Sequence, residues 1–431
     1  MDHFSYIDGR LHAEGVDAHG IVERYGSPVY VYSARTLREH VATLRQAFAP
    51  AAPMICFSVK SCANLSVLRL LADAGCGMDV VSGGELYRAL AAGVAADRIV
   101  FAGVGKSMDE IRYAVEQGVH MFNAESEAEM ARLDEAALAA GKRVRVAVRV
   151  NPDVADAGTP AKTSTGGRQT KFGVPLSRAA ALFVPGRHRG LDVCGVHVHL
   201  GSPIHDTRTY LAAIGRIEEL VAEVERGGGR VDTVNLGGGF PAHYGRSEGG
   251  AELVDMGRAI CERLEPLRAR GKRFIIEPGR SISANAGVLL TTVEYVKQGW
   301  DRLVTVLNAG MNTLLRPSMY GAEHFMWPAQ HGSHTGHWNA LAGPNAFEPT
   351  DIVGPICETG DYFALGRPLP PMKSGDVLAV FSCGAYGMSM ASQYNARARP
   401  AEVMVDGTEV REIRRRESYA DLVAHEVDGM S

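Results

Sequence analysis

The sequence predicts an α/β protein with two parts, a (β/α)8 barrel and a separate β domain. A chain of 431 residues has room for two or three domains. Between residues 54 and 277, short apolar runs alternate with amphipathic stretches, which is typical of βαβ units and a parallel sheet. After Arg280 the chain becomes rich in β-type runs separated by Pro and Gly clusters, and helical periodicity is scarce.

Eight apolar runs are candidates for the barrel strands. They are residues 54–59, 77–81, 99–102, 120–123, 145–150, 193–200, 233–236 and 273–277. Helices are expected between them at residues 65–74, 84–92, 126–140 and 210–226. Eight units in about 220 residues favour a closed barrel. An open doubly wound sheet, with strands miscounted, is the alternative.

The expected β domain has strands at residues 288–296, 303–307, 350–353, 377–381 and 401–405. Residues 29–32, near the start of the chain, are also strand-like. Residues 331–349 are rich in Gly, His, Asn and Pro, which predicts a surface loop. Residues 158–167 form a polar segment in an interval too long for one βα unit, and we expect a mobile loop near the site there.

The composition is that of an ordinary globular protein, with 46% hydrophobic and 22% charged residues. A net charge of −4 argues against nucleic acid as a partner. The sequence contains no run of about 18 apolar residues, so no transmembrane helix is expected. The first residues lack an apolar secretory segment. The seven cysteines include no Cys-x-x-Cys pair, which disfavours a zinc ribbon or a disulfide framework. We therefore expect a cytoplasmic protein with no membrane association and no bound metal.

Lys60 and Glu277 each follow an apolar run, and parallel strands of a barrel end at the same mouth. Glu277 opens the tetrapeptide Glu277-Pro278-Gly279-Arg280. Pyridoxal phosphate enzymes need such a pair, an amine that holds the cofactor aldehyde and an anion that keeps the ring nitrogen protonated. Taken alone, Lys60 could equally be a phosphate ligand or a surface charge, and Glu277 could equally pair with Arg280.

His197 and His199 are expected on one face of a strand. This alternation suits the metal pair of barrel hydrolases, although those enzymes usually carry it early in the barrel and here it falls on the sixth run. His197 could instead be packed in the core, and His199 could lie flat against an aromatic cofactor.

Three glycines, Gly237-Gly238-Gly239, follow the seventh run. Bare backbone N–H groups at a strand-to-helix turn can hold a phosphate, and such barrels often bind phosphate after the seventh and eighth strands. A simple tight turn is the alternative.

The second half carries further candidate residues. Cys357 and Glu358 lie on a turn rich in acidic residues, which disfavour a thiolate and favour Cys357 as a proton donor. A buried structural cysteine is the alternative. Arg316 and Tyr320 lie four residues apart, and arginine binds carboxylates bidentately. Tyr386 lies on a Gly-rich turn.

Together these residues resemble the fold-type III pyridoxal phosphate-dependent decarboxylases, most closely the diaminopimelate branch. The resemblance covers nearly the whole chain. Its motifs are Tyr30-Val31-Tyr32-Ser33, Phe57-Ser58-Val59-Lys60, Asp79-Val80-Val81-Ser82-Gly83-Gly84-Glu85, Arg149-Val150-Asn151-Pro152-Asp153, Lys171-Phe172-Gly173, His199-x-Gly201-Ser202, Glu277-Pro278-Gly279-Arg280, Arg316-Pro317, Cys357-Glu358-x-Gly360-Asp361 and Gly384-Ala385-Tyr386-Gly387.

The resemblance implies a pyridoxal 5'-phosphate barrel at residues 36–284. It also implies a β-sandwich-like domain made of residues 1–35 and 285–431. The reaction would be the decarboxylation of meso-2,6-diaminopimelate to L-lysine and CO2 in lysine biosynthesis. A homodimer is expected, in which the Cys-Glu segment of one chain completes the active site of the other.

Residue roles follow from the same resemblance. Lys60 would carry the cofactor, and Cys357 would donate a proton to the substrate Cα. The cofactor-binding residues would be Lys60, His199, Ser202, Gly238, Gly239, Glu277, Gly279, Arg280 and Tyr386. The substrate-binding residues would be Arg280, Arg316, Tyr320, Glu358 and Tyr386.

Two departures from the family pattern leave the substrate open. Pro203 follows Ser202 where members commonly have Gln, and Thr159-Pro160-Ala161-Lys162 stands where many carry a His-Pro-Tyr-type segment. A decarboxylase of a related amino acid, or of a siderophore or antibiotic intermediate, is therefore an alternative. A metal-dependent barrel hydrolase that uses His197 and His199 is a second. A non-catalytic pyridoxal phosphate-binding protein is a third, but the large β domain argues against it.

Overall fold

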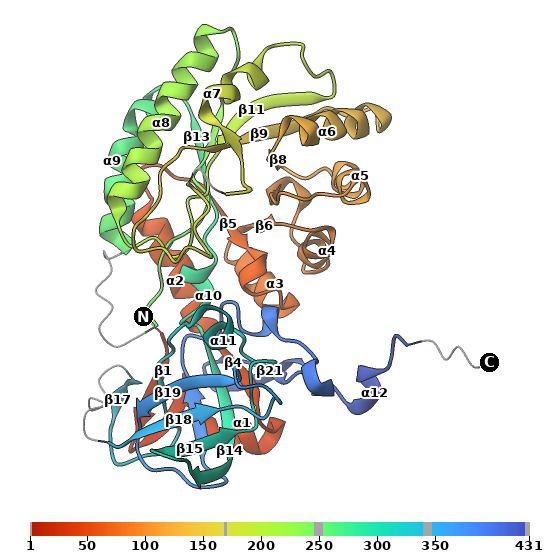
Figure 1. The fold of residues 1–431 in the computed structure, drawn as a ribbon. Helices are drawn as coiled ribbons and strands as arrows, with labels where there is room; N and C mark the ends of the chain where they lie inside the picture. The colour runs from red at the N-terminus through yellow and green to blue at the C-terminus, as the bar shows by residue number, and fades with distance from the viewer. Residues whose placement is uncertain (1, 168–169, 245–252, 339–346, 427–431) are drawn as a thin grey trace, which may run out of the picture. The chain divides into compact units, whose positions relative to one another are not determined.

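The computed structural model describes residues 2–167, 170–244, 253–338 and 347–426 (Figure 1). The chain divides into two compact units. The first, which we call the β unit, contains Met1–Glu39, His243–Glu248 and Ser283–Ser431. The second, the barrel unit, contains His40–Ala242 and Gly249–Ile282.

The barrel unit is a closed ring of eight parallel strands. The ring runs β5-β6-β7-β8-β9-β11-β12-β13 and closes where β13 pairs with β5. The strands are β5 (Met54–Ser58), β6 (Gly77–Val80), β7 (Ile99–Phe101), β8 (Met121–Ala124), β9 (Val144–Asn151), β11 (Leu191–His197), β12 (Thr233–Asn235) and β13 (Arg273–Ile276). This closed ring confirms the predicted (β/α)8 barrel and excludes the open sheet.

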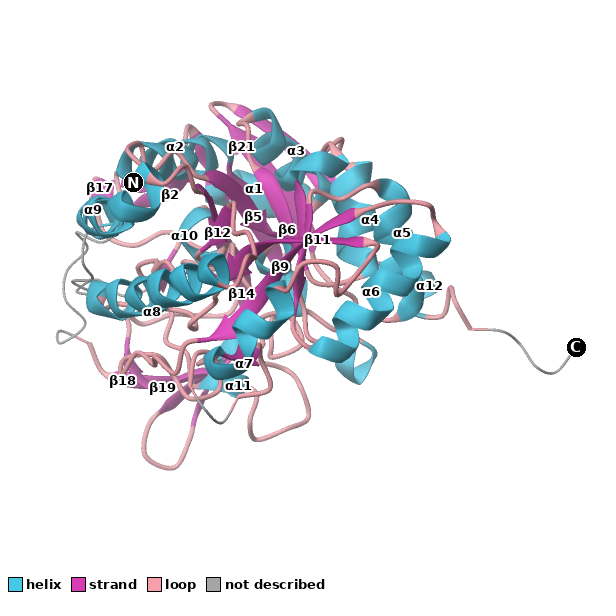
Figure 2. Ribbon diagram, turned by 90° about the horizontal axis from the view of Figure 1, so that it is seen from above, coloured by secondary structure: helices cyan, strands magenta, loops and turns pink. Residues whose placement is uncertain are grey.

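Helices surround the barrel strands, as Figure 2 shows. They are α3 (Leu65–Asp73), α4 (Gly83–Ala91), α5 (Met108–Gln117), α6 (Glu127–Ala139), α7 (Leu176–Ala179), α8 (Thr207–Arg226) and α9 (Leu253–Ala269), and α2 (Ala34–Ala47) precedes β5. Five of them begin after a residue whose side chain accepts a hydrogen bond from a backbone N–H of the first turn, namely Asn64, Ser82, Ser107, Ser126 and Asp206. Each such cap stabilises a helix start by about 1 kcal/mol.

The inside of the ring is filled by apolar side chains from six strands. Cys56, Val100, Met121, Ala147, Cys194 and Ile275 form one buried cluster. Because this cluster closes the interior, the polar side chains of the strands gather at the strand ends, where chemistry is possible.

The strand expected at residues 193–200 ends earlier than predicted. β11 stops at His197, so His199 lies in the following loop and does not share a strand face with His197. The reason is that its neighbour β12 is short. The parallel ladder pairs His197 with Asn235, the last residue of β12, and has no partner beyond it.

The β unit contains two sheets. The larger has the order β19-β18-β15-β14-β4-β21-β22, and β20 also pairs with β14 while β16 pairs with β20. Its strands are β4 (Val29–Ser33), β14 (Gly287–Gln298), β15 (Leu303–Leu307), β16 (Met326–Pro328), β18 (Pro349–Val353), β19 (Tyr362–Pro368), β20 (Val377–Val380), β21 (Ala401–Asp406) and β22 (Glu409–Arg414). The amino-terminal strand β4 is fully buried between β14 and β21.

The smaller sheet has the order β17-β1-β2-β3, with β1 (Phe4–Ile7), β2 (Arg10–Ala13), β3 (Val16–Asp17) and β17 (Gly336–His337). β17 falls within the surface loop expected at residues 331–349, so part of that loop is a strand, and residues 339–346 lie outside the described residues. The described chain also contains the short helices α1 (Ala18–Tyr25), α10 (Arg280–Ser283), α11 (Arg316–Tyr320) and α12 (Tyr419–Leu422), and the two-residue strand β10 (Val174–Pro175) beside β9.

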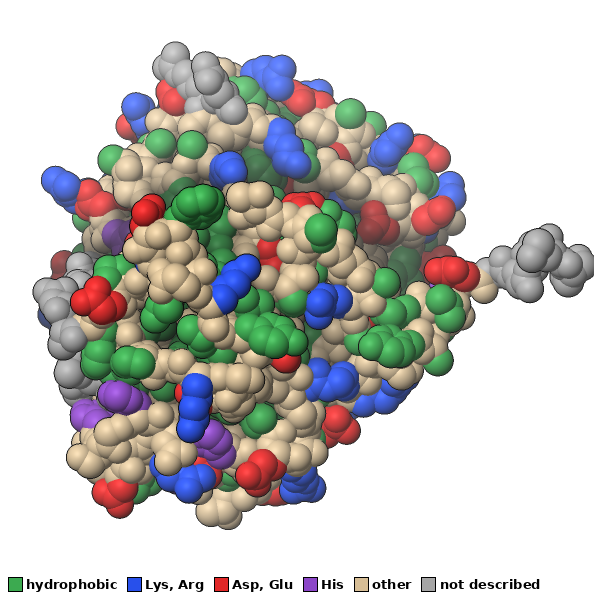
Figure 3. Space-filling model, turned by 60° about the horizontal axis from the view of Figure 1, so that its bottom comes forward, with side chains coloured by type: hydrophobic (Ala, Val, Ile, Leu, Met, Phe, Trp, Pro, Cys, Tyr) green, Lys and Arg blue, Asp and Glu red, His purple; other side chains and the backbone are tan. Residues whose placement is uncertain are grey.

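Across the described ranges, no helix combines the length and the apolar character that a membrane span requires. On the face drawn in Figure 3, Lys and Arg side chains are interspersed with Asp and Glu. This mixture agrees with the small net charge of −4.

Candidate active site

Lys60 stands just past the carboxyl end of β5, at the mouth of the barrel. It lies in a 3-10 turn over Val59–Ser61, and its side chain is half-buried. The Ser61 hydroxyl donates to the Ser58 carbonyl at 2.7 Å, which fixes the turn. The local sequence therefore presents the amine at the face where (β/α)8 enzymes carry their active sites.

Glu277 follows β13 at the same mouth and is held by three donors. Asn123 and Asn235, in β8 and at the end of β12, donate their amide groups to Oε1 at 2.9 and 2.6 Å. The His197 Nε2 lies 3.1 Å from Oε2. Glu277 is 5% exposed and His197 is 1% exposed. The carboxylate is thus fixed in orientation and shielded from water.

The pKa of Glu277 lies below its ordinary value. Burial by itself raises the pKa of a carboxyl group, but the interactions with His197 and the hydrogen bond from Asn235 outweigh it here. Glu277 is therefore an anion at neutral pH, as the partner of a protonated pyridine nitrogen must be.

Asp79 of β6 is a second buried carboxyl group in the barrel. The Ser58 hydroxyl donates to its Oδ2 at 2.7 Å, while Oδ1 has no partner among the described residues. Burial and then the Glu277 anion raise the pKa of Asp79 to about 7, against the lowering effect of Lys60. Glu277 and Asp79 therefore differ: the pKa of Glu277 is lowered, and that of Asp79 is raised to about 7.

The His199 ring is held by the glycine turn that follows β12. The Gly238 N–H donates to Nδ1 at 3.0 Å, so the proton of the neutral ring is on Nε2. Burial, and then the cations of Lys60 and Arg149, hold the pKa of His199 well below its ordinary value. The ring is therefore neutral and fixed, as suits a side chain that lies flat against an aromatic cofactor.

The two histidines make separate contacts. His197 Nε2 contacts Glu277 and His199 Nδ1 accepts from Gly238. Within the part of the chain that the structure describes, no group of three His, Cys, Asp or Glu side chains is placed to bind a metal ion.

The turns after β12 and β13 leave no space for side chains. A Cβ on Gly238 would lie 2.2 Å from the Glu277 carbonyl oxygen, and one on Gly239, where φ is +107°, would lie 2.5 Å from the Gly201 carbonyl oxygen. A Cβ on Gly279 would lie 3.1 Å from the Ser58 side chain. Backbone is therefore bare at the position where such barrels bind phosphate.

Arg280 and Ser202 lie at the same strand ends. Arg280 begins α10 and is buried, and its Nε donates to the Ser202 hydroxyl at 3.0 Å. The segment expected to be a loop near the site contacts this region, because the Thr159 hydroxyl donates to the Pro203 carbonyl at 2.6 Å and the Thr165 hydroxyl donates to the His199 carbonyl at 2.7 Å.

The other five predicted site residues belong to the β unit. Arg316 and Tyr320 begin and end α11, where Arg316 is buried and Tyr320 is half-buried. Tyr386 is half-buried and has a left-handed backbone, with φ at +56°. A non-glycine residue in this conformation is uncommon.

Cys357 and Glu358 lie on an exposed turn. The Cys357 N–H donates to the Asn395 side chain at 2.8 Å, and the Tyr394 hydroxyl donates to the Glu358 carboxylate. Asp361 anchors the turn from within, because its carboxylate accepts the N–H groups of Ile356 and Met311, each at 2.6 Å. The thiol is therefore on the surface of a well-fixed turn, and the buried alternative does not apply.

The barrel mouth fits pyridoxal phosphate. It offers an amine, a buried anion, a neutral ring and a bare glycine turn beside Arg280. The prediction missed Asn123, Asn235 and His197 as the residues that hold Glu277. The signal that identified Lys60, a polar residue at the end of an apolar run, also marks Asn123 and, one residue before the end of its run, Asn235, whereas His197 lies inside the run 193–200.

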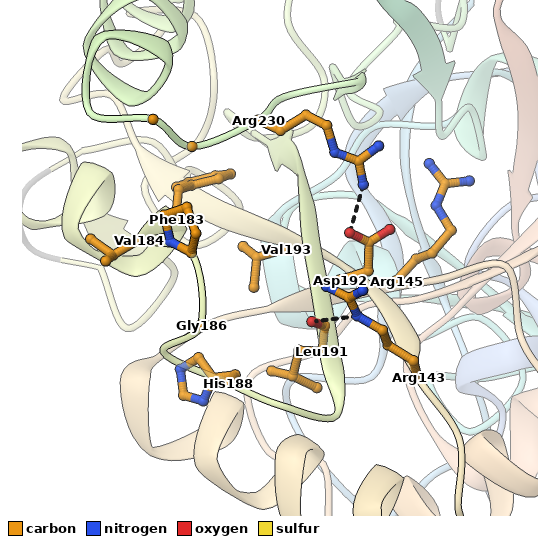
Figure 4. A pocket seen from close by; sticks show the side chains of 13 residues that line it. Arg143, Arg145, Phe183, Val184, Gly186, His188, Leu191, Asp192, Val193 and Arg230 are labelled. Atoms are coloured by element: carbon orange, nitrogen blue, oxygen red, sulfur yellow. Dashed lines mark hydrogen bonds and ion pairs between the residues drawn. The ribbon is translucent and has the colours of Figure 1, made fainter.

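A cavity of about 460 Å³ lies elsewhere in the barrel unit (Figure 4). It is lined at the amino-terminal ends of β9 and β11, opposite to the ends that precede Lys60 and Glu277. Arg230 donates to Asp192 at 2.6 Å and Arg143 donates to the Leu191 carbonyl at 3.2 Å. This cavity is therefore separate from the candidate active site.

Known proteins with the same arrangement match the chain along its length. Residues 34–284 match the family described as pyridoxal-dependent decarboxylase, pyridoxal binding domain. A diaminopimelate decarboxylase from Pseudomonas fluorescens is 43% identical over 432 residues, with 99% of each chain covered. One from Aquifex aeolicus is 39% identical, with 99% of this chain and 98% of the relative covered.

Solved structures agree. The diaminopimelate decarboxylase of M. jannaschii, in co-complex with L-lysine, has a TM-score of 0.90 and 34% identity over 98% of each chain. That of Helicobacter pylori, complexed with L-lysine, has a TM-score of 0.86 and 34% identity, with 95% of this chain and 98% of the other covered. These similarities confirm the fold, the cofactor and the family that the motifs indicated. The chain belongs to the diaminopimelate decarboxylases, within the pyridoxal-dependent decarboxylases.

Proposed function

We propose that this protein decarboxylates meso-2,6-diaminopimelate to L-lysine and CO2, with pyridoxal phosphate held on Lys60. The observation that carries the proposal is the buried Glu277 anion, held by three donors at the same barrel mouth as Lys60. When bound, pyridoxal phosphate supplies an electron sink for the pair that remains on the substrate Cα after CO2 leaves.

Different barrel residues bind different parts of the cofactor. Lys60 would hold its aldehyde, Glu277 would keep its ring nitrogen protonated and His199 would contact its ring. Ser202, Gly238, Gly239, Gly279 and Arg280 hold its phosphate, which needs the bare backbone and the buried guanidinium found there.

The β-unit residues act on the substrate. Arg316, Tyr320, Glu358 and Tyr386 bind it together with Arg280. The Cys357 thiol donates one proton to Cα, which replaces the carboxylate lost as CO2. The exposed position of the thiol supports this role, because a proton donor must reach the reacting atom.

A decarboxylase of a related amino acid is the second candidate. Pro203 departs from the family pattern, and its carbonyl accepts the hydrogen bond from Thr159 of the segment that also departs. The test is the release of CO2 from a panel that contains diaminopimelate, lysine, ornithine and arginine. We expect release from meso-diaminopimelate, with lysine as the product.

Borohydride reduction and peptide mapping should then find the pyridoxyl group on Lys60, and a label on another lysine would overturn that assignment.

We further propose a cytoplasmic homodimer with shared active sites, in which Cys357 and Glu358 complete the site of the partner chain. Mixing inactive Lys60→Ala with inactive Cys357→Ala should then restore activity. About half of the dimers are mixed, and each has one intact site of two, so activity approaches about a quarter of wild type. If the subunits exchange and no activity returns, Cys357 acts within its own chain or not at all.

A further inference from the structure

Arg316 is a buried cation whose charge is not neutralised. It is 8% exposed, and no carboxylate of a described residue lies within ion-pair distance of its guanidinium. Its contacts are a hydrogen bond from Nη1 to His324 Nε2 at 2.8 Å and the face of the Tyr244 ring, whose centroid is 4.4 Å from Cζ. Burying a charge without a counter-charge is costly, so an arginine in this state points to an anionic ligand.

His324 provides Arg316 with a neutral hydrogen-bond acceptor. The ring is 1% exposed, and its Nδ1 lies 2.8 Å from the Phe381 carbonyl oxygen. A carbonyl oxygen only accepts, so Nδ1 carries the proton, and a guanidinium only donates, so Nε2 must be the acceptor. A proton on Nε2 would remove the acceptor and put a second cation against Arg316. The two contacts therefore fix one neutral tautomer.

The barrel unit contains a buried arginine of the opposite kind. Arg149 Nη1 lies 2.5 Å from the carboxylate of Glu125, and both side chains are buried. That carboxylate neutralises Arg149 and leaves it a structural residue. At Arg316 the acceptor is an imidazole, which fixes the direction of the guanidinium but does not cancel its charge.

We infer that His324 is a positioning residue for substrate specificity: it orients Arg316 through a neutral acceptor and so preserves the positive charge for a carboxylate of the substrate. The Tyr244 ring supports the same orientation, because a cation over an aromatic face is attracted without being neutralised. The inference rests on the proposed function in taking Arg316 as a substrate-binding residue.

The experiment compares two acceptors that differ in charge. In His324→Gln, the amide can accept from Arg316 and donate to the Phe381 carbonyl, so we expect KM for meso-diaminopimelate within about threefold of wild type. In His324→Glu, the carboxylate pairs with Arg316 and competes with the substrate. We expect KM to rise by about 10–100-fold, the factor typical of a lost hydrogen bond to a charged group, with a much smaller change in kcat.

Two further measurements separate positioning from folding. The thermal midpoint and the visible absorbance of the bound cofactor should remain close to wild type in both variants. The matched pair His331→Gln and His331→Glu changes a half-buried histidine elsewhere in the β unit, and neither should shift KM.

The outcomes are distinct. Equal KM values for His324→Gln and His324→Glu, with wild type active, would overturn the inference and leave the proposed function intact. If KM rises only in variants whose thermal midpoint falls, loss of stability explains the change, and the inference is also overturned. If wild type does not decarboxylate meso-diaminopimelate, the proposed substrate is wrong, and the comparison is made with the panel amino acid that is decarboxylated. An enzyme that releases CO2 from none of them overturns both.

Discussion

The charged groups at the barrel mouth and those of the β unit have different kinds of partner. In the barrel, Glu277 is enclosed by three donors of the same unit, and Arg280 contacts Ser202. In the β unit, the described partners of Arg316 are the neutral rings of His324 and Tyr244, and Cys357 lies exposed on its turn. This difference agrees with the proposal that the barrel residues hold a permanent cofactor and that Arg316 meets a carboxylate group of a transient substrate.

The largest effect should come from the barrel mouth. Glu277→Gln removes the anion but keeps the shape, so the ring nitrogen loses the partner that holds its proton. We expect the cofactor to stay bound and kcat to fall by several powers of ten, since each ~1.36 kcal/mol of transition-state stabilisation is tenfold in rate. Absorbance and steady-state kinetics measure both quantities. Near wild-type kcat with bound cofactor would contradict the role of Glu277, and the surface variant Glu265→Gln is the control.

The second effect concerns stability and contrasts a buried ion pair with an exposed one. Glu125 also accepts the Gly173 N–H, and Arg149 lies over the Phe172 ring with Cζ 4.5 Å from its centroid. Glu125→Gln leaves Arg149 buried with a weaker partner, which typically costs about 3–5 kcal/mol of unfolding free energy.

The matched variant in the β unit is Glu409→Gln, which removes the exposed pair with Arg411. It should leave the urea midpoint unchanged within error, because solvent screens such pairs. Urea titrations of both variants decide the contrast. Equal midpoints for the two would mean that burial does not set the strength of these pairs.

The barrel and its mouth could be predicted because one signal marks both. A buried parallel strand is an apolar run, and the polar residue that ends it lies at the mouth, as Lys60 and Glu277 do. The same signal applies to Asn123 and Asn235, but an asparagine after a strand is common in turns and does not by itself indicate a ligand of a carboxylate.

The environment of Arg316 could not be predicted in this way. Its partners His324 and Tyr244 come from loops, and neither follows a run that the sequence marks as a barrel strand. His199 was misplaced for a related reason: the length of β11 depends on the length of its neighbour β12, which is a property of the pairing and not of the residues themselves.

The last effect is a pH dependence that differs between two buried aspartates, one in each region. The raised pKa of Asp79, about 7, exceeds its ordinary value, so the native state binds the proton more tightly than the unfolded state. Its contribution to stability is present below about pH 4 and is lost as pH rises through about 7. Asp79→Asn does not titrate. In the cofactor-free protein, its stability relative to wild type should therefore increase between pH 4 and 7, by about 1.4 kcal/mol for each unit of the pKa difference, and then stay constant.

Burial also raises the pKa of Asp361, but its two oxygens accept two backbone N–H groups. An asparagine has only one acceptor oxygen, so Asp361→Asn should be less stable than wild type throughout this range. Urea unfolding at a series of pH values measures both variants. A flat difference for Asp79→Asn would mean that the Asp79 carboxyl group does not titrate near neutral pH in the folded protein.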